Sequence, residues 1–349
     1  QKNVELMIFS AEKWNKGAEL KALMKVNTAI SFDMMEAPLR GAFRQYLVPL
    51  LGDAMAGEVV EIYNFGPDPD VLEQNTEGAT EREKLDARLL EICQRANANL
   101  AFWNDFDEIS VRITDAGFQR QKSDNESFQG VYKYQEDNLR MSFRNKGFNA
   151  LDELLEFLYA HIAEYPEFAT SQAYQDRKSA IVRSTADVND VCFIGGSRII
   201  FLRLQPHLKF VEEMLLQPAI GDRLYEHLID GLVNPPEDEE RRKNVERLRL
   251  ACSRYIGTMA VRRLLMETGS ITDRGLYFTT IRSGEKGNEQ KEPVDTKRIA
   301  VQIQNLKADA DMYMTALLRI ARSYFTDYYA GDPRRIFDRD NDRKRTFWV

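Results

Sequence analysis

The sequence contains few of the residues from which enzymes build active sites. It has three histidines, His161, His207 and His227, and none has a second ligand residue at the spacing of a metal site. Its three cysteines are isolated and odd in number, which predicts buried thiols in a reducing compartment rather than disulfides. No Ser or Cys lies in a nucleophile-elbow pattern. We therefore predict no catalytic residue, no cofactor-binding residue and no metal site.

Long apolar runs and an excess of positive charge are also missing. No stretch approaches the roughly 20 apolar residues that span a bilayer, so we expect no transmembrane helix within the chain. The first residues carry no apolar signal segment, so we also expect no secretory signal there. The net charge of -7 argues against a general nucleic-acid binder, and we expect no sequence-specific nucleic-acid partner. With 349 residues, 43% hydrophobic and 30% charged, the composition predicts a soluble globular protein of two domains.

Two patterns resemble functional motifs but favour turns. The segment Gly195-Gly196-Ser197 lacks the spacing of a dinucleotide-binding loop, and we interpret it as a turn before a helix that Ser197 caps. Asp115 and Asp273 resemble a catalytic pair of carboxylates. An aspartate that precedes a glycine after a strand more often satisfies local backbone amides, so we assign both to turns.

The most informative feature that is present is an internal repeat. The segment Pro49-Leu50-Leu51-Gly52-Asp53 returns 169 residues later as Pro218-Ala219-Ile220-Gly221-Asp222. A shorter loop in the second copy explains why later matches are 158 or 159 residues apart. Repeated modules usually build surfaces, rings or arrays. The further matches pair Ile113–Gly117 with Ile271–Gly275, and Leu89, Cys93 and Ala101 with Leu248, Cys252 and Ala260. The repeated structural motif therefore consists of Pro49, Gly52, Asp53, Asp115, Gly117, Pro218, Gly221, Asp222, Asp273 and Gly275.

Apolar residues at helical spacing predict a mainly α fold with small β hairpins, made of two homologous helical modules in tandem. In the first module we expect a helix that begins at a capping box of Asp33 and Glu36 and ends at Pro49 and Gly52. A long helix follows a second capping box, Thr80 with Glu83. A hairpin and a closing helix, residues 126–145, complete the module. The predicted counterparts in the second module are a helix ended by Pro218 and Gly221, a long helix over 238–266, a hairpin, and a closing helix over 295–324.

The predicted domain organisation follows from this repeat. Residues 1–147 form the first module, 148–196 a helical connector without a counterpart, and 197–330 the second module. Phe43 or Leu47 should take the core places of Val211 or Leu215, and Cys93 that of Cys252. Residues 331–349 form a charged tail that cannot build a core. We expect this tail to dock on a neighbouring subunit through Arg334, Arg335, Phe347 and Trp348.

Three segments resemble, in order, structural proteins encoded by phages and prophages of Bacteroidetes. The segments are Tyr46–Asp53, Leu151–Leu158 and Ser197–Phe201. A helix that ends in Pro-x-x-Gly is also similar to head–tail connector (adaptor) proteins of tailed phages. The chain departs from the pattern at Asp53-Ala54-Met55-Ala56, where the family tends to have Leu-Tyr after the Gly, whereas the second copy, Asp222-Arg223-Leu224-Tyr225, keeps it.

The resemblance implies a virion structural protein without enzymatic activity, located in the virion and, during assembly, in the host cytoplasm. It implies a neck or connector ring, with further copies of the chain and portal or tail components as partners. A repeat suits such a ring because it supplies two quasi-equivalent contact surfaces per chain. Two alternatives remain open at this point, a cytoplasmic protein-interaction scaffold and an enzyme with its site between the two modules.

Overall fold

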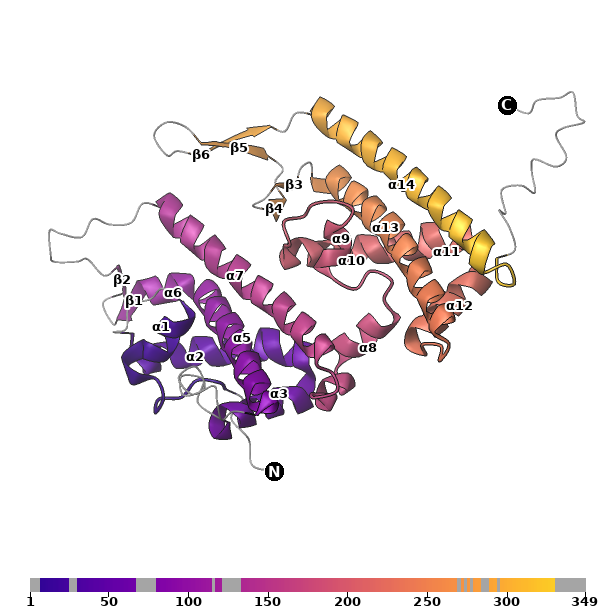
Figure 1. Cartoon of the computed structure of the whole chain (residues 1–349). Coiled ribbons are helices and arrows are strands. Elements are labelled where there is room, and N and C mark those ends of the chain that lie inside the picture. Colours follow the sequence, from indigo (N-terminus) through magenta and orange to yellow (C-terminus); the bar gives the residue numbers. More distant parts are fainter. Residues whose placement is uncertain are drawn as a thin grey trace, which may run out of the picture. The chain divides into compact units, whose positions relative to one another are not determined.

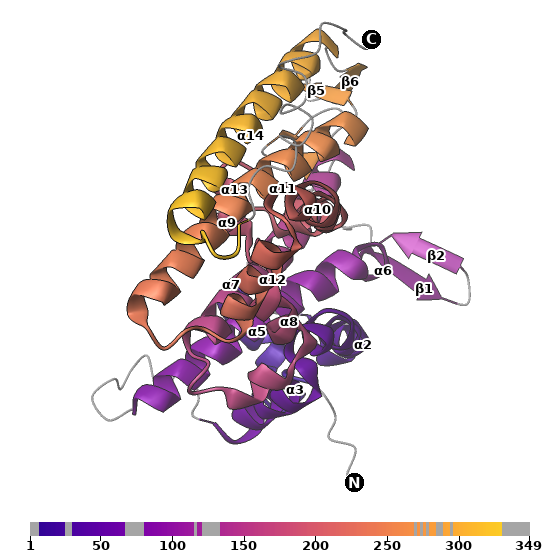
Figure 2. The ribbon, with the colours of Figure 1, turned by 90° about the vertical axis from the view of Figure 1, so that its right-hand side faces the viewer.

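The computed structural model divides the chain into two compact units. One comprises residues 1–176 with 283–289, and the other 177–282 with 290–349. The described residues are mainly helical, as the sequence predicts (Figures 1 and 2). They are 7–24, 30–66, 80–114, 117–120, 133–268, 271–272, 275–276, 279–283, 289–293 and 296–329.

In the first unit, α5 is the central helix, and α1, α2, α3 and α7 pack around it. α7 runs alongside α5 for much of its length (Figure 1). Nearly every α5 residue between Leu89 and Phe102 is buried, and the alanines among them let neighbouring helices approach closely. The helices of this unit are η1 (Asn15–Gly17), α1 (Ala18–Leu23), α2 (Phe32–Ala42), the π-helical turn η2 (Phe43–Leu47), α3 (Val48–Phe65), α5 (Glu81–Asn104), α6 (Phe106–Ser110), α7 (Lys133–Ala160) and η3 (Pro166–Thr170).

In the second unit, α13 takes the central place, and α9, α10, α12 and α14 pack against it. α14 lies along α13, as Figure 1 shows. The helices of this unit are α9 (Thr185–Asn189), α10 (Arg198–Val211), the π-helical turn η4 (Glu212–Leu216), α11 (Gln217–Ile220), α12 (Asp222–Val233), α13 (Glu239–Thr268) and α14 (Thr296–Tyr324); α8 (Gln172–Ser179) contains the boundary between the units.

Short strands follow each central helix. β1 (Val111–Thr114) pairs antiparallel with β2 (Gly117–Arg120), with Val111 opposite Arg120. β3 (Ile271–Thr272) pairs antiparallel with β4 (Gly275–Leu276). A further two-stranded sheet joins β5 (Thr279–Ser283) and β6 (Glu289–Pro293).

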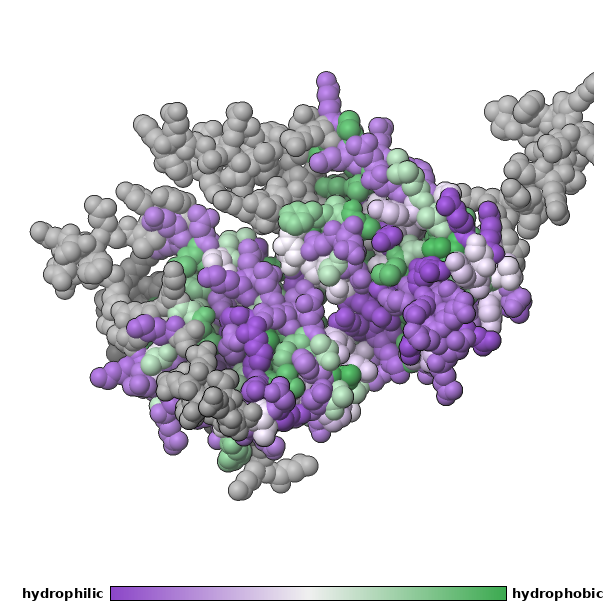
Figure 3. All heavy atoms as spheres, in the orientation of Figure 1, coloured by the Kyte–Doolittle hydropathy of each residue, from purple (hydrophilic) through white to green (hydrophobic). Residues whose placement is uncertain are grey.

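The repeat is visible in the packing of the two units. Residues 169 positions apart in α2–η2–α3 and α10–η4–α11–α12 are buried at the same steps along the helices. Cys93 and Cys252 are both fully buried on the central helices, as predicted. Hydrophilic side chains cover most of the visible surface outside these cores (Figure 3). The pairs of buried residues that lie 169 positions apart are Met35 and Leu204, Leu39 and Leu208, Ala42 and Val211, Leu47 and Leu216, Leu51 and Ile220, Met55 and Leu224, Val59 and Leu228, and Tyr63 and Leu232.

The expected core equivalences in the first helix were one residue out of register. Leu47 corresponds to Leu216, which is fully buried, and not to the partly exposed Leu215. Phe43 corresponds to Glu212, so an aromatic core residue in one copy is a carboxylate in the other. The expected pairs lie 168 positions apart, whereas the offset is 169 both before and after the π-helical turns, which occupy equivalent positions in the two copies.

The predicted boundary at residue 147 was also wrong, because it falls inside α7. A Cβ on Gly147 would lie 2.6 Å from Leu100 Cγ, so this glycine lets α7 pack closely on α5 and does not end the helix. Residues 148–160 therefore belong to the first module. They have a counterpart 163 positions later, since Leu154 and Leu158 correspond to the buried Leu317 and Ala321 of α14.

The predicted helix starts had mixed outcomes. Thr80 and Glu83 form the expected capping box, in which each side chain bonds the other residue's backbone N–H. Ser197 caps α10 as predicted, and its hydroxyl accepts from the N–H of Ile200. The Asp33 box was wrong, because α2 already begins at Phe32 and its N-cap, Ser31, makes no side-chain capping bond.

Candidate functional site

The motif Pro-x-x-Gly-Asp forms the same helix break in both units. A π-helical turn precedes each proline, and its last bond joins the N–H of Val48 to the Phe43 carbonyl, or the N–H of Gln217 to the Glu212 carbonyl. The wide turn makes room for the proline ring, which would clash with a carbonyl in a continuous α-helix. Pro49 and Pro218 thus lie inside helical segments, which corrects the prediction that they end them.

The two glycines carry the break itself. Gly52 has φ 76° and ψ 162°, and Gly221 has φ 84° and ψ 148°. This region of backbone space is almost restricted to glycine, which is why the break occurs at this residue in both copies. The helix resumes at once, with the exposed Asp53 or Asp222 at its first turn, where a negative charge interacts favourably with the helix dipole. The motif therefore redirects a helix and holds no reactive group.

Several of the other predicted site residues lie outside the described residues. This applies to Asp115 and Asp273, and to the tail residues Arg334, Arg335, Phe347 and Trp348. Gly117 and Gly275 are described only as the first residues of β2 and β4.

The histidines and cysteines occupy separate packed environments. His161 packs on Phe157, with ring centroids 4.7 Å apart, and His227 stacks on Tyr328 at 3.8 Å. His207 Nε2 lies 3.4 Å from Glu267 Oε2. Among the described residues, no group of three or more His, Cys, Asp or Glu could hold a metal ion.

Burial makes the two matched cysteines poor nucleophiles. It raises the pKa of the thiol of Cys93 and of Cys252, and the charge of Glu212 raises the pKa of Cys252 further. The thiolate is the reactive form, so both side chains act as small core residues at neutral pH.

A buried ion cluster fastens the segment before α10 to the central helix of the second unit. The guanidinium of Arg249 donates to the Ile181 carbonyl at 2.7 Å and to Glu246 Oε1 at 2.8 Å, and Arg249 Nη1 lies 3.3 Å from Asp187 Oδ2. Asp187 also accepts from the backbone N–H of Arg183. Burial and the charge of Arg249 lower the pKa of Arg183. The positive charges of Arg183 and Arg249 balance the negative charges of Asp187 and Glu246, which suits a structural role.

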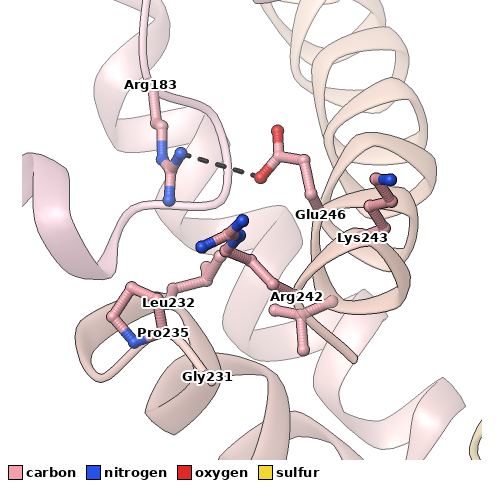
Figure 4. A pocket seen from close by; sticks show the side chains of 8 residues that line it. Arg183, Gly231, Leu232, Pro235, Arg242, Lys243 and Glu246 are labelled. Atoms are coloured by element: carbon pink, nitrogen blue, oxygen red, sulfur yellow. Dashed lines mark ion pairs between the residues drawn. The ribbon is translucent and has the colours of Figure 1, made fainter. Parts of the chain in front are cut away.

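A pocket of about 360 Å³ opens beside this cluster. Arg183 and Glu246 point toward one another, 3.8 Å apart, and the Arg242 guanidinium lies toward the same space (Figure 4). Leu232, Pro235 and Val245 supply an apolar part of the wall. A cationic rim with an apolar wall suits an acidic group with an apolar portion. None of the eight lining residues is a Ser, Cys, His or Tyr, so the lining offers no nucleophile of these kinds.

This cluster is not among the sites that the sequence predicts. Its one available indication was the repeat alignment, in which Arg249 takes the position of the buried Leu90, 159 residues earlier. A charge on a helix face that is apolar in the twin module predicts a buried ion pair. Tertiary structure was needed to bring Asp187 and Ile181 to it.

In the first unit, an aromatic and ionic cluster holds the segment after α7. The Arg82 guanidinium lies 4.2 Å from the centre of the Tyr165 ring and pairs with Glu58 and Asp86. The Tyr165 hydroxyl donates to Asp86 Oδ1 at 2.9 Å. In the second unit, His227 takes the position of Glu58 and stacks directly on Tyr328. Both clusters fold the end of a closing helix back onto its module.

The comparisons with known proteins agree with the repeat. A family model described as "Family of unknown function (DUF6712)" matches residues 47–178 and 216–331, two stretches that begin 169 positions apart. The chain belongs to this family. No curated protein and no solved structure matches the chain. Within the described residues, no helix has the length and apolar character needed to cross a membrane.

Proposed function

We propose that this chain is a non-catalytic structural subunit of a head–tail connector ring in a tailed-phage particle. The observation that carries the proposal is the repeat, in which two modules share the helix break and the core positions but differ at their surfaces. A chain of this kind presents two related but distinct contact surfaces, as a ring subunit needs. The finer description, two homologous helical modules that each carry a small β hairpin, is part of the same proposal.

The phage setting rests on the resemblance of Tyr46–Asp53, Leu151–Leu158 and Ser197–Phe201 to phage structural proteins. The proposed partners are further copies of the chain and adjacent portal or tail proteins. The proposed location is the virion, with the host cytoplasm as the place of assembly. The tail beyond residue 330 is proposed to extend onto a neighbouring subunit.

Particle composition tests this function. Tailed particles purified from the host that carries the gene should contain the protein at a fixed ratio to the major capsid protein, measured by quantitative mass spectrometry. Deleting the gene should leave heads and tails unjoined. A protein found only outside particles, with normal particles after deletion, would instead support the cytoplasmic scaffold.

A further inference from the structure

The outward face of α10 and η4 carries apolar side chains at every fourth position. Leu202 is 42% exposed, Phe210 38% and Met214 58%, and Pro206 between them is also exposed. The π-helical turn is wider than an α-turn and keeps Met214 near the line of this stripe. We refer to these four residues and Met266 as the apolar patch.

Met266 joins the stripe from the central helix. The guanidinium of Arg263 lies 3.7 Å from the centre of the Phe210 ring, which places this part of α13 beside α10. Met266 follows one helical turn later and is 59% exposed. The patch therefore draws on two neighbouring helices, α10 with its π-helical turn and α13.

The first module has no such patch. Its corresponding residues, found at offsets of 169 and 159, are Asp33, Ala37, Gly41, Gln45 and Asp107, all polar or small. Those on α2 and η2 are exposed like their counterparts, and the Asp107 side chain is 75% exposed. Since the first module folds with polar residues there, an apolar face is not required for the module to fold. Contact with another surface accounts for it.

Charge indicates which surface that is. Residues 1–176 contain 18 Lys or Arg and 30 Asp or Glu, a net charge of -12, whereas residues 177–349 contain 30 and 25, a net charge of +5. Of the charged residues next to the patch, Glu213 lies 3.8 Å from Lys209 Nζ and Glu267 lies 3.4 Å from His207 Nε2. Arg203 and Arg263 also border the patch, and among the described residues neither of these arginines forms an ion pair. An acidic partner surface would complement them.

We propose that the apolar patch docks on the acidic first unit of a second copy of this chain, in a head-to-tail contact. A contact of patch with patch would set the basic arginines of two copies against each other. Head-to-tail contact pairs opposite charges, and such heterologous contacts close into rings or extend into filaments. The inference rests on the proposed function in that it names the contact by which the subunits join.

Sedimentation velocity of the full chain tests the contact. The wild-type protein should associate beyond a dimer as its concentration rises, and less so as NaCl is raised from about 0.05 M to about 0.5 M. The variant Leu202→Asp, Met214→Gln, Met266→Asp installs the first module's own residues. It should weaken association by about 100-fold or more, because three apolar side chains lose their burial.

A matched control adds the same two negative charges elsewhere in the second unit. Gln302→Asp with Asn305→Asp, both at exposed positions of α14, should associate like the wild type. A wild-type chain that stays monomeric, one that stops at a dimer, or a patch variant that associates normally would overturn the proposal. None of these results would affect whether the protein is found in particles, so the two proposals fail separately.

Discussion

At the scale of single residues, Asn97 is the least satisfied polar group of the core. It lies fully buried in the middle of α5, and neither its amide nitrogen nor its oxygen has a hydrogen-bond partner among the described residues. Its counterpart in α13 is the buried Ile256. An unsatisfied buried amide is destabilising, whereas an apolar group of the same shape is not.

We predict that Asn97→Leu raises the free energy of unfolding by about 1 kcal/mol. Gln94→Met, three residues earlier on α5, is the matched control. Gln94 donates to the Ile8 carbonyl at 2.9 Å and to Glu19 Oε1 at 3.0 Å, so its loss should cost about 1–3 kcal/mol. Urea unfolding of both variants measures the difference, and a destabilised Asn97→Leu would show that the amide has a role not seen in these contacts.

Glu212 is another residue that breaks the symmetry of the two cores. It replaces Phe43, and it accepts a hydrogen bond of 2.8 Å from the hydroxyl of Tyr225, which replaces Ala56. Burial raises the pKa of Glu212, the bond from Tyr225 lowers it by less, and the charge of Glu213 adds to the rise. The folded protein thus binds the Glu212 proton more tightly than the unfolded chain does.

The sign of the pH effect follows from this. The stabilisation is fully present below the unfolded pKa of glutamate and is lost as pH rises through the raised folded pKa. Glu212→Gln should therefore be more stable than the wild type at pH 7, by on the order of 1 kcal/mol, with the gap shrinking toward pH 4. Thermal unfolding across this range provides the measurement. The exposed Glu226→Gln serves as the control, and a gap independent of pH would refute the assignment.

At the scale of elements, the helix breaks depend on the backbone of their glycines. A Cβ on Gly52 would contact Ser171 Cβ at 3.2 Å, whereas one on Gly221 would meet nothing within 4 Å. Both substitutions to alanine carry the strain of a positive φ, and only the first adds crowding. We predict losses of about 1–3 kcal/mol in the free energy of unfolding, larger for Gly52→Ala.

Gly57→Ala gives the matched control for these variants. Gly57 lies in α3, and a Cβ there would meet nothing within 4 Å. This change should stabilise the protein by about 0.5–1 kcal/mol, as glycine-to-alanine replacements in helices do. If Gly52→Ala proved equally harmless in the same unfolding assay, the backbone account of the motif would be wrong.

These elements also mark how far local sequence patterns reach. Thr80 and Ser197 were predictable as caps, because capping depends on residues within one turn. The glycines were predictable for a similar reason. The π-helical turns before Pro49 and Pro218 were not, since proline alone predicts a break and gives no information on how packing accommodates it. The boundary at residue 147 was misplaced because only the neighbouring Leu100 explains why Gly147 lies inside a long helix.

At the scale of the whole molecule, the repeat was predictable because equal spacing of Pro, Gly and Cys is visible in the sequence. The differences between the copies required the structure. Leu202, Phe210 and Met214 are apolar at helical spacing and resemble core residues in the sequence alone. The offset of 169 aligns them with Asp33, Gly41 and Gln45, but only their exposure in the structure identifies them as a surface.

The central claim, that this duplicated chain is an assembly subunit whose second module docks on the first module of its neighbour, is tested most directly by electron microscopy. Purified wild-type protein and the variant Leu202→Asp, Met214→Gln, Met266→Asp should be imaged in negative stain at the same high concentration. The account predicts rings or short filaments for the wild type and single particles for the variant. Single particles in both samples, or the same rings in both, would contradict it.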